Sequence, residues 1–196
     1  TTDKVARLWS VDAKTGEVCQ SFGDTGKGYT DLSRGMGENL PDFWYMNTSQ
    51  PLVAGDFIVL GGWVFDGIQT EEPSGVIRGF HAKTGELAWA WDLGNPDINM
   101  MPPKGETYSK GTPNWWSHGA YDAKLGLVYI PLGNATPDFW GAHRTPEMNK
   151  YATSVVALNV KTGKEAWHFQ AVHMDTWDYD NGAPPLFVDM PDGKGG

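Results

Sequence analysis

The sequence predicts an all-β fold, a partial β-propeller of about 2.7 four-stranded blades. A Lys-Thr-Gly turn recurs in three similar segments, at residues 11–17, 80–89 and 158–167. The turn glycines are 69 and 78 residues apart, which leaves room for four strands and their loops at each step. No segment keeps a 3.6-residue apolar period over several helical turns, so we expect helices to be minor.

The repeat spacing predicts that all 196 residues are part of a single propeller domain. Residues 1–22 are expected to end one blade, because the first Lys-Thr-Gly turn closes its last hairpin. The second blade is predicted at 52–92, the third at 117–170, and residues 171–196 would start the next one. Closed propellers have about 4–8 blades, so the length predicts a piece of a larger protein, ending in a turn at 192–196 without its return strand.

Alternating or apolar runs flank the turns and are expected to form the strands. Runs 74–80 and 154–158 lead into the second and third turns, and 56–62 and 126–132 are further strand candidates. Each turn is therefore predicted to close a hairpin, with its glycine in the left-handed conformation.

Tryptophan accounts for ten residues, which a repeated packing role explains better than any one site. Trp89 and Trp167 each follow the turn glycine by four residues, whereas the first copy has Gln20 at that place. We expect the two tryptophans to wedge neighbouring blades. A β-sandwich is the structural alternative, although it requires no repeated turn with a tryptophan.

The composition excludes several functional classes. The net charge is −9 and the isoelectric point is near 4.9, so binding to nucleic acid or to an anionic membrane surface is not expected. Cys19, the one cysteine of the sequence, can form neither an internal disulfide nor a thiolate metal site. The sequence holds no apolar run of membrane-spanning length and no nicotinamide-binding or phosphate-loop motif. Composition leaves the compartment open.

Polar and aromatic residues concentrate at residues 173–180. In an extended segment, Asp178 and Asp180 would share one face, while Trp177 and Tyr179 would pack on the other. Paired carboxylates suit a divalent metal or a general base, and a solvated acidic turn is the alternative.

Two further clusters offer a stacking surface and oxygen ligands. Residues 111–118 contain the adjacent Trp115 and Trp116, of which one can enter the core while the other faces a cavity. Packing of both rings in the core is the alternative. Residues 133–140 supply amide, hydroxyl and carboxylate oxygens, which suit a hard cation better than zinc. Asp66, just past a strand candidate, is either a further part of this chemistry or a turn residue.

Taken in order, these clusters resemble the pyrroloquinoline quinone (PQQ) dehydrogenases, in particular the membrane-bound glucose dehydrogenase branch. The strings that carry the resemblance are SGVIRGF at 74–80, GNATPDFWG at 133–141, RTPE at 144–147 and Trp-Asp at 177–178. The resemblance covers essentially the whole chain. It implies an eight-bladed propeller, of which this chain would form a part.

The resemblance implies a role for each site residue. Asp178 would be the general base that takes the proton from the substrate hydroxyl, and Trp116 would stack under the quinone ring. Asp66 and Thr136 would contact the cofactor and ligate a calcium or magnesium ion, with Asn134 as a neighbouring alternative. PQQ would accept hydride from the substrate carbon.

A second aspartate, Asp180, follows the expected base by two residues. Related alcohol dehydrogenases use such a residue as a lanthanide ligand, whereas the glucose branch often has an acidic residue there without that metal. Asp180 is therefore a further metal-ligand candidate, and calcium or magnesium is favoured. The sequence departs from the glucose-branch pattern at Gly67, where asparagine is common, at Met174, in place of a second histidine, and at Ser117-His118, in place of Ala-Pro.

The resemblance implies a PQQ-dependent oxidoreductase that oxidises an aldose or polyol hydroxyl, faces the periplasm and passes electrons to a membrane quinone. The remaining propeller blades of the parent chain would be its structural partners. The isolated residues would be inactive, with open blade edges that pair with other chains. The alternatives are a non-catalytic propeller scaffold with the same repeat and a quinate- or alcohol-type quinoprotein dehydrogenase.

Overall fold

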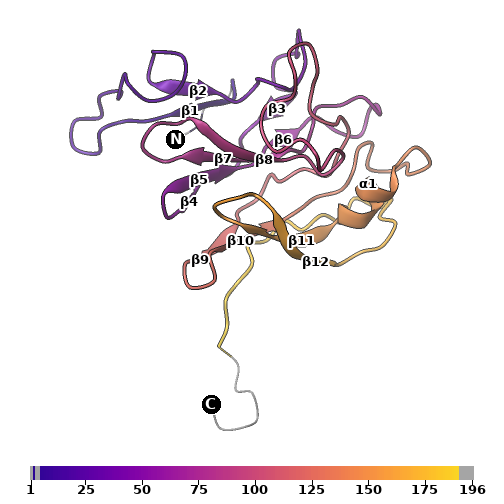
Figure 1. Cartoon of the computed structure of the whole chain (residues 1–196). Helices are drawn as coiled ribbons and strands as arrows, with labels where there is room; N and C mark the ends of the chain where they lie inside the picture. Colours follow the sequence, from indigo (N-terminus) through magenta and orange to yellow (C-terminus); the bar gives the residue numbers. More distant parts are fainter. Residues whose placement is uncertain (1, 3–4, 190–196) are drawn as a thin grey trace.

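The computed structural model describes residue 2 and residues 5–189 (Figure 1). Within these residues the chain forms short antiparallel strands in four sheets, and its one helix, α1 (Pro146–Tyr151), is six residues long. None of the described residues form a helix long and apolar enough to cross a membrane. The prediction of minor helix content is confirmed.

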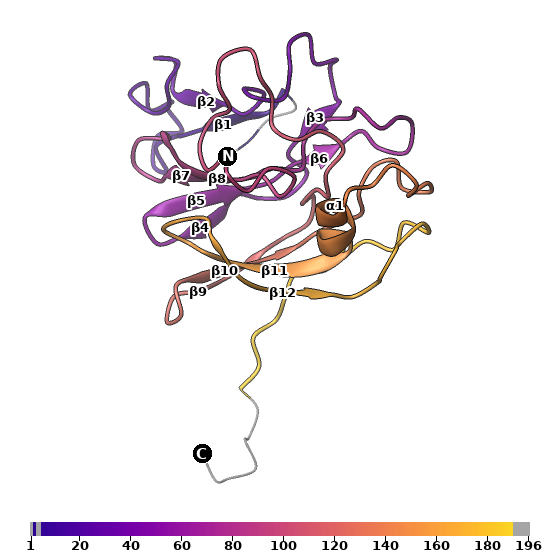
Figure 2. The ribbon, with the colours of Figure 1, turned by 45° about the vertical axis from the view of Figure 1, so that its right-hand side comes forward.

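Two four-stranded meanders form the body of the structure (Figures 1 and 2). The strands of the first are β4 (Leu52–Ala54), β5 (Phe57–Leu60), β7 (Ile77–His81) and β8 (Leu87–Trp91). The strands of the second are β9 (Ala120–Asp122), β10 (Leu127–Pro131), β11 (Ser154–Asn159) and β12 (Glu165–Gln170). In both sheets the neighbours in space are also neighbours along the chain, apart from β6. A sheet of this kind is what a propeller blade requires.

Two small sheets precede or flank the first meander. Strand β1 (Arg7–Trp9) pairs with β2 (Tyr29–Asp31), and β3 (Tyr45–Met46) pairs with β6 (Trp63–Val64). The sheet of β1 and β2 thus continues past residue 22, where the first blade was expected to end. Residues 171–189 form no strand, and the turn expected at 192–196 lies outside the described residues.

The three Lys-Thr-Gly turns have the predicted backbone. Gly16, Gly85 and Gly163 have φ of +75°, +73° and +68°. In the third turn the N–H of Gly163 donates to the carbonyl of Asn159 (2.8 Å), and Asn159 Oδ1 accepts from two further amides. Asp12 Oδ1 does the same in the first turn. The left-handed glycine of each turn is confirmed.

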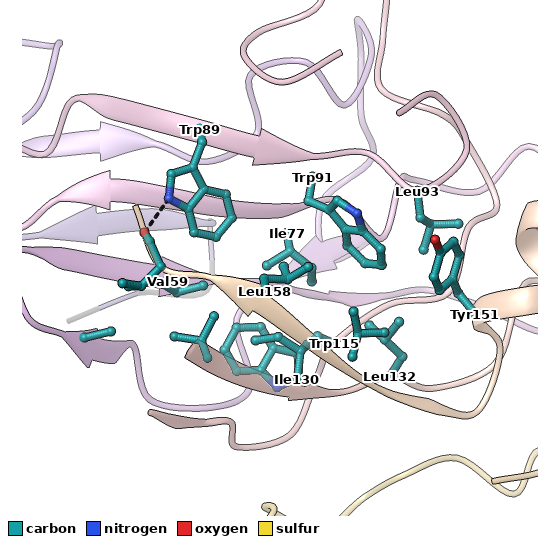
Figure 3. Close-up of a cluster of buried hydrophobic side chains, with 14 residues drawn as sticks. Val59, Ile77, Trp89, Trp91, Leu93, Trp115, Ile130, Leu132, Tyr151 and Leu158 are labelled. Carbon is teal, nitrogen blue, oxygen red and sulfur yellow. Dashed lines mark hydrogen bonds between the residues drawn. The ribbon is translucent and has the colours of Figure 1, made fainter. Parts of the chain in front are cut away.

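Trp89 joins the two meanders in the hydrophobic core (Figure 3). Its indole N–H donates to the carbonyl of Val160 at 2.8 Å, and its ring lies on the third turn, because a Cβ added to Gly163 would be 2.4 Å from it. Phe22 makes the equivalent contact on Gly85, although the sequence pointed to position 20. Trp167 at the corresponding place in the second meander is 44% exposed.

Candidate active site

Four segments far apart in the sequence meet at one end of the two meanders, near α1 on the right of Figure 2. The segments are 66–72, 111–118, 133–138 and 175–182. The N–H of Gly111 donates to the carbonyl of Glu72 (2.9 Å), and its own carbonyl accepts from the N–H of Thr136 (3.2 Å). Backbone contacts of this kind hold the candidate residues of three loops together.

The tryptophan pair divides between core and site. Trp115 is buried between the meanders with 2% of its surface exposed, whereas Trp116 is half-buried (Figure 3 shows Trp115). The Trp116 indole N–H donates to Asp180 Oδ2 at 2.7 Å. The second oxygen of that carboxylate, Oδ1, accepts from the N–H of Asn134 at 2.6 Å. The prediction that one ring enters the core is confirmed.

The extended conformation predicted for residues 173–180 is wrong. Met174, Asp178 and Asp180 have φ of +51°, +60° and +48°, so the segment bends repeatedly instead of alternating. Trp177 and Tyr179 are 76% and 66% exposed and do not pack under the aspartates. Asp178 is exposed, and partial burial together with the charge of Asp175 raises its pKa.

Asp175 is the physical reason for this bend. Its carboxylate is fully buried and accepts from Thr153 Oγ1 (2.6 Å) and from the N–H groups of Trp177 (2.9 Å) and Tyr179 (3.0 Å). Burial alone would raise the pKa of Asp175, but these hydrogen bonds lower it below its usual value. The side chain thus folds the chain around itself and presents Asp178 at the tip.

Arg144 ties the loop of Asp175 to the loop of Thr136, and sequence reasoning gave it no role. The buried guanidinium donates to the carbonyl of Asp175 and to the carbonyls of Ala135 (3.0 Å) and Asp138 (3.1 Å). Burial lowers the pKa of Arg144, and the charges of Asp175 and Asp138 oppose that shift. The only earlier signal was its place in the RTPE string.

Negative charge is crowded where the metal site was expected. Burial, then the charges of Asp180 and Asp178, raise the pKa of Asp66 to about 6. Burial and the charges of Asp66 and Asp178 raise the pKa of Asp138 to about 7. A Cβ added to Gly67 would be 3.6 Å from Asp138 Oδ2, so Asp138 faces this glycine. Asp138 is the one carboxylate of residues 133–140, whose oxygens the sequence offered to a hard cation, although the family resemblance gave it no role.

The oxygens that remain available fit a hard cation. Thr136 Oγ1 is fully buried and has no hydrogen-bond partner in the described part of the chain. The Asn134 amide nitrogen instead donates to the carbonyls of Asp138 (3.0 Å) and Asp175 (3.2 Å), while its oxygen accepts from Ala135. Among residues 5–189, no three His, Cys, Asp or Glu side chains are close enough to hold a metal alone, so hydroxyl or cofactor oxygens would have to complete the shell.

Known proteins resemble the chain along its whole length. The family model for the β-propeller domain of PQQ glucose/ethanol/alcohol dehydrogenases matches residues 1–196. The glycerol dehydrogenase large subunit of Gluconobacter oxydans (strain 621H) is 46% identical over 185 residues, and the quinoprotein glucose dehydrogenase of Escherichia coli (strain K12) is 46% identical over 184. Both alignments cover 94% of this chain, but only 24% and 23% of the relatives. The chain thus spans about a quarter of their length.

The fold is also found among solved structures. Quinohemoprotein alcohol dehydrogenase from Comamonas testosteroni superposes with a TM-score of 0.66 at 24% identity, over 92% of this chain and 27% of that structure. This likeness concerns the fold alone. The family match along all 196 residues shows that the chain is part of a β-propeller and belongs to the PQQ glucose/ethanol/alcohol dehydrogenase family.

Proposed function

We propose that this chain forms part of the active site of a PQQ-dependent dehydrogenase that oxidises a hydroxyl group of an aldose or a polyol. The convergence of Asp66, Trp116, Thr136 and the 175–180 loop at one end of the meanders carries the proposal. Relatives named glycerol dehydrogenase and glucose dehydrogenase support the two substrate classes. The activity is a property of the whole protein, since the chain spans about a quarter of each relative.

Asp178 is the proposed general base. It lies at the exposed tip of the loop that Asp175 folds, where a substrate hydroxyl can reach it. A carboxylate removes a hydroxyl proton efficiently as the carbon loses hydride, because the negative charge on oxygen never fully develops. Asp175 keeps the carboxylate of Asp178 at this position through backbone contacts on both sides of it.

Trp116, Asp66 and Thr136 are the proposed cofactor and metal residues. When bound, PQQ would supply the hydride acceptor, and calcium or magnesium would supply a Lewis acid beside it. Trp116 offers an indole face for a planar ring. Asp66 and the Thr136 hydroxyl, which has no partner among the described residues, would hold the cation. Its positive charge would oppose the burial and the neighbouring negative charges that raise the pKa of Asp66. Asn134 is a neighbouring candidate whose present side-chain hydrogen bonds would have to change, and the two hydrogen bonds on the Asp180 carboxylate argue against Asp180 as a ligand.

We further propose that the whole protein faces the periplasm and passes electrons to a membrane quinone. Its blades would divide this chain at residues 1–22, 52–92, 117–170 and 171–196. A cofactor-free scaffold has no need for a stacking ring, an unpartnered buried hydroxyl and an exposed acid in one place.

The test is Asp178→Asn in the full-length enzyme. Turnover should fall by about 10²–10⁴-fold, the usual contribution of a general base, while quenching of tryptophan fluorescence by added PQQ and calcium should persist. Asp97→Asn, an exposed aspartate outside the site, is the control and should keep full turnover. Undiminished turnover of Asp178→Asn would refute the assignment of the base, and no quenching by PQQ in the wild type would favour the scaffold.

A further inference from the structure

We propose that Asp180 is a positioning residue that fixes the indole ring of Trp116, and that it is not a ligand of the metal ion. This inference rests on the proposed function only where PQQ is the ligand that stacks on the ring. The observation behind it is a pair of short hydrogen bonds on one carboxylate, from Trp116 Nε1 (2.7 Å) and from the N–H of Asn134 (2.6 Å).

The two hydrogen bonds orient the ring from a fixed point. An indole has a single donor, so rotation of the Trp116 ring breaks its bond to Oδ2. The carboxylate cannot follow the ring, because Oδ1 is held by the backbone at Asn134, which is itself fixed by its side-chain amide. Hydrogen bonds to a charged acceptor are about twice as strong as neutral ones.

Close packing on both sides limits other arrangements. A Cβ added to Gly133 would be 2.7 Å from Asp180 Oδ1, and one added to Gly182 would be 3.0 Å from the Trp116 ring carbon Cη2. The carbonyl of Trp116 accepts from Thr48 Oγ1 (2.8 Å). Two positions without side chains therefore make room for the carboxylate and the ring, and the backbone of Trp116 is held separately.

The same contacts argue against metal ligation by Asp180. A cation bound to this carboxylate would compete with both hydrogen bonds for the same two oxygens and so weaken the bond from the half-buried indole N–H. The Thr136 hydroxyl, which has no hydrogen-bond partner among the described residues, can bind a cation without breaking a contact of this kind. The negative charge next to Nε1 also polarises the indole toward higher electron density, which favours stacking on an electron-poor quinone.

A double-mutant cycle in the full-length enzyme tests the inference, with Asp180→Asn, Trp116→Phe and the double variant. In Asp180→Asn the single amide oxygen can serve only one of the two N–H donors, so ring fixation is weakened at constant shape. Trp116→Phe keeps a stacking ring but has no donor. Asp97→Asn is the matched control for loss of a carboxylate charge.

Three measurements apply to each variant. The first, made without cofactor, is the hydrogen-bond-sensitive indole band in ultraviolet resonance Raman spectra, assigned to Trp116 by its loss in Trp116→Phe. The second is the dissociation constant of PQQ at saturating calcium, and the third is the calcium concentration for half-maximal PQQ binding. Thermal unfolding followed by circular dichroism reports whether each variant is folded.

We expect Asp180→Asn to shift the indole band and to weaken PQQ binding by about tenfold, the value of one charge-assisted hydrogen bond. The calcium requirement should stay unchanged, and Asp180→Asn should have no further effect in the Trp116→Phe background. An unchanged indole band, a raised calcium requirement, or an equal loss of PQQ affinity in both backgrounds would overturn the inference. If Asp180→Asn does not fold, Asp180→Glu takes its place, because it keeps the charge but moves the two oxygens, and it should shift the indole band at an unchanged calcium requirement.

The proposed function and this inference fail separately. If the wild type binds no PQQ while Asp180→Asn still shifts the indole band, the proposed function is wrong and the positioning role of Asp180 stands. If PQQ binds and Asp180→Asn only raises the calcium requirement, Asp180 is a metal ligand and the proposed function stands.

Discussion

At the scale of single residues, the candidate site depends on carboxylates with different roles. Asp175 and Asp180 accept hydrogen bonds with both oxygens, whereas Asp66 and Asp138 are crowded acids with raised pKa values. The sequence places these four carboxylates near glycine, tryptophan or strand ends but does not distinguish their roles. To tell these roles apart one must know which backbone amides point at each carboxylate, and that depends on the folded loop. The sequence pattern assumed an extended segment, in which Asp178 and Asp180 share a face, whereas both residues have a left-handed backbone.

The pH dependence of stability should reveal Asp175. Because its pKa is lowered in the folded state, the unfolded chain binds a proton more readily, so the carboxylate stabilises the fold above the unfolded pKa of about 3.9. That contribution is lost as pH falls through the folded value. Asp175→Asn should lower the free energy of unfolding by about 1–3 kcal/mol at pH 6, since its amide faces backbone donors that it cannot satisfy.

Urea unfolding of wild type and Asp175→Asn between pH 6 and pH 3 gives this comparison. The difference between the two proteins should shrink as the pH decreases. Asp97→Asn should show no such trend, because that aspartate is exposed. A difference that stays constant down to pH 3 would mean that the charge of Asp175 has no part in holding the loop.

At the scale of elements, the repeated turn was predictable, because each copy carries its own local signal. A glycine adopts the left-handed backbone of the turn, and an aromatic side chain of the preceding copy packs on that glycine in the second and third turns. Gly163 and Trp89 are 74 residues apart in the sequence, yet each is recognisable from its own copy of the repeat. The first copy departs from the pattern: Phe22 takes the place expected for residue 20. The strand β2 was missed because its three residues, within a glycine-rich segment, are too short for a periodic signal.

Gly163→Ala should destabilise the protein through the contact with Trp89. The left-handed backbone alone costs a non-glycine residue about 1–2 kcal/mol, and here the added methyl would also lie 2.4 Å from the indole ring. Gly126→Ala is a matched control, because Gly126 has nearly the same φ (+67° against +68°) and no atom within 4 Å of the added Cβ. The free energy of unfolding, from urea titration, should therefore fall further for Gly163→Ala. Equal losses would show that the ring moves aside without cost.

At the scale of the whole molecule, the site is made by loops from successive blades and not by any one blade. Asp66 precedes β7 of the first meander, Thr136 lies between β10 and β11 of the second, and Trp116 lies on the connection between the two. Such a site depends on the docking of blades, which Trp89 secures here. The second meander ends in β12, an edge strand whose Trp167 and Phe169 are 44% and 67% exposed.

This exposed edge predicts the behaviour of residues 1–196 by themselves. Trp167 and Phe169 lie two apart on β12 and so share a face, and an edge strand offers unpaired backbone groups to another chain. The isolated chain should therefore self-associate, as measured by light scattering coupled to size-exclusion chromatography. Replacing both residues by serine should shift it toward the monomer. Leu125→Ser, at an exposed leucine (59%) in the β9–β10 turn, should not. A monomeric wild-type chain would contradict the view that this face needs the next blade.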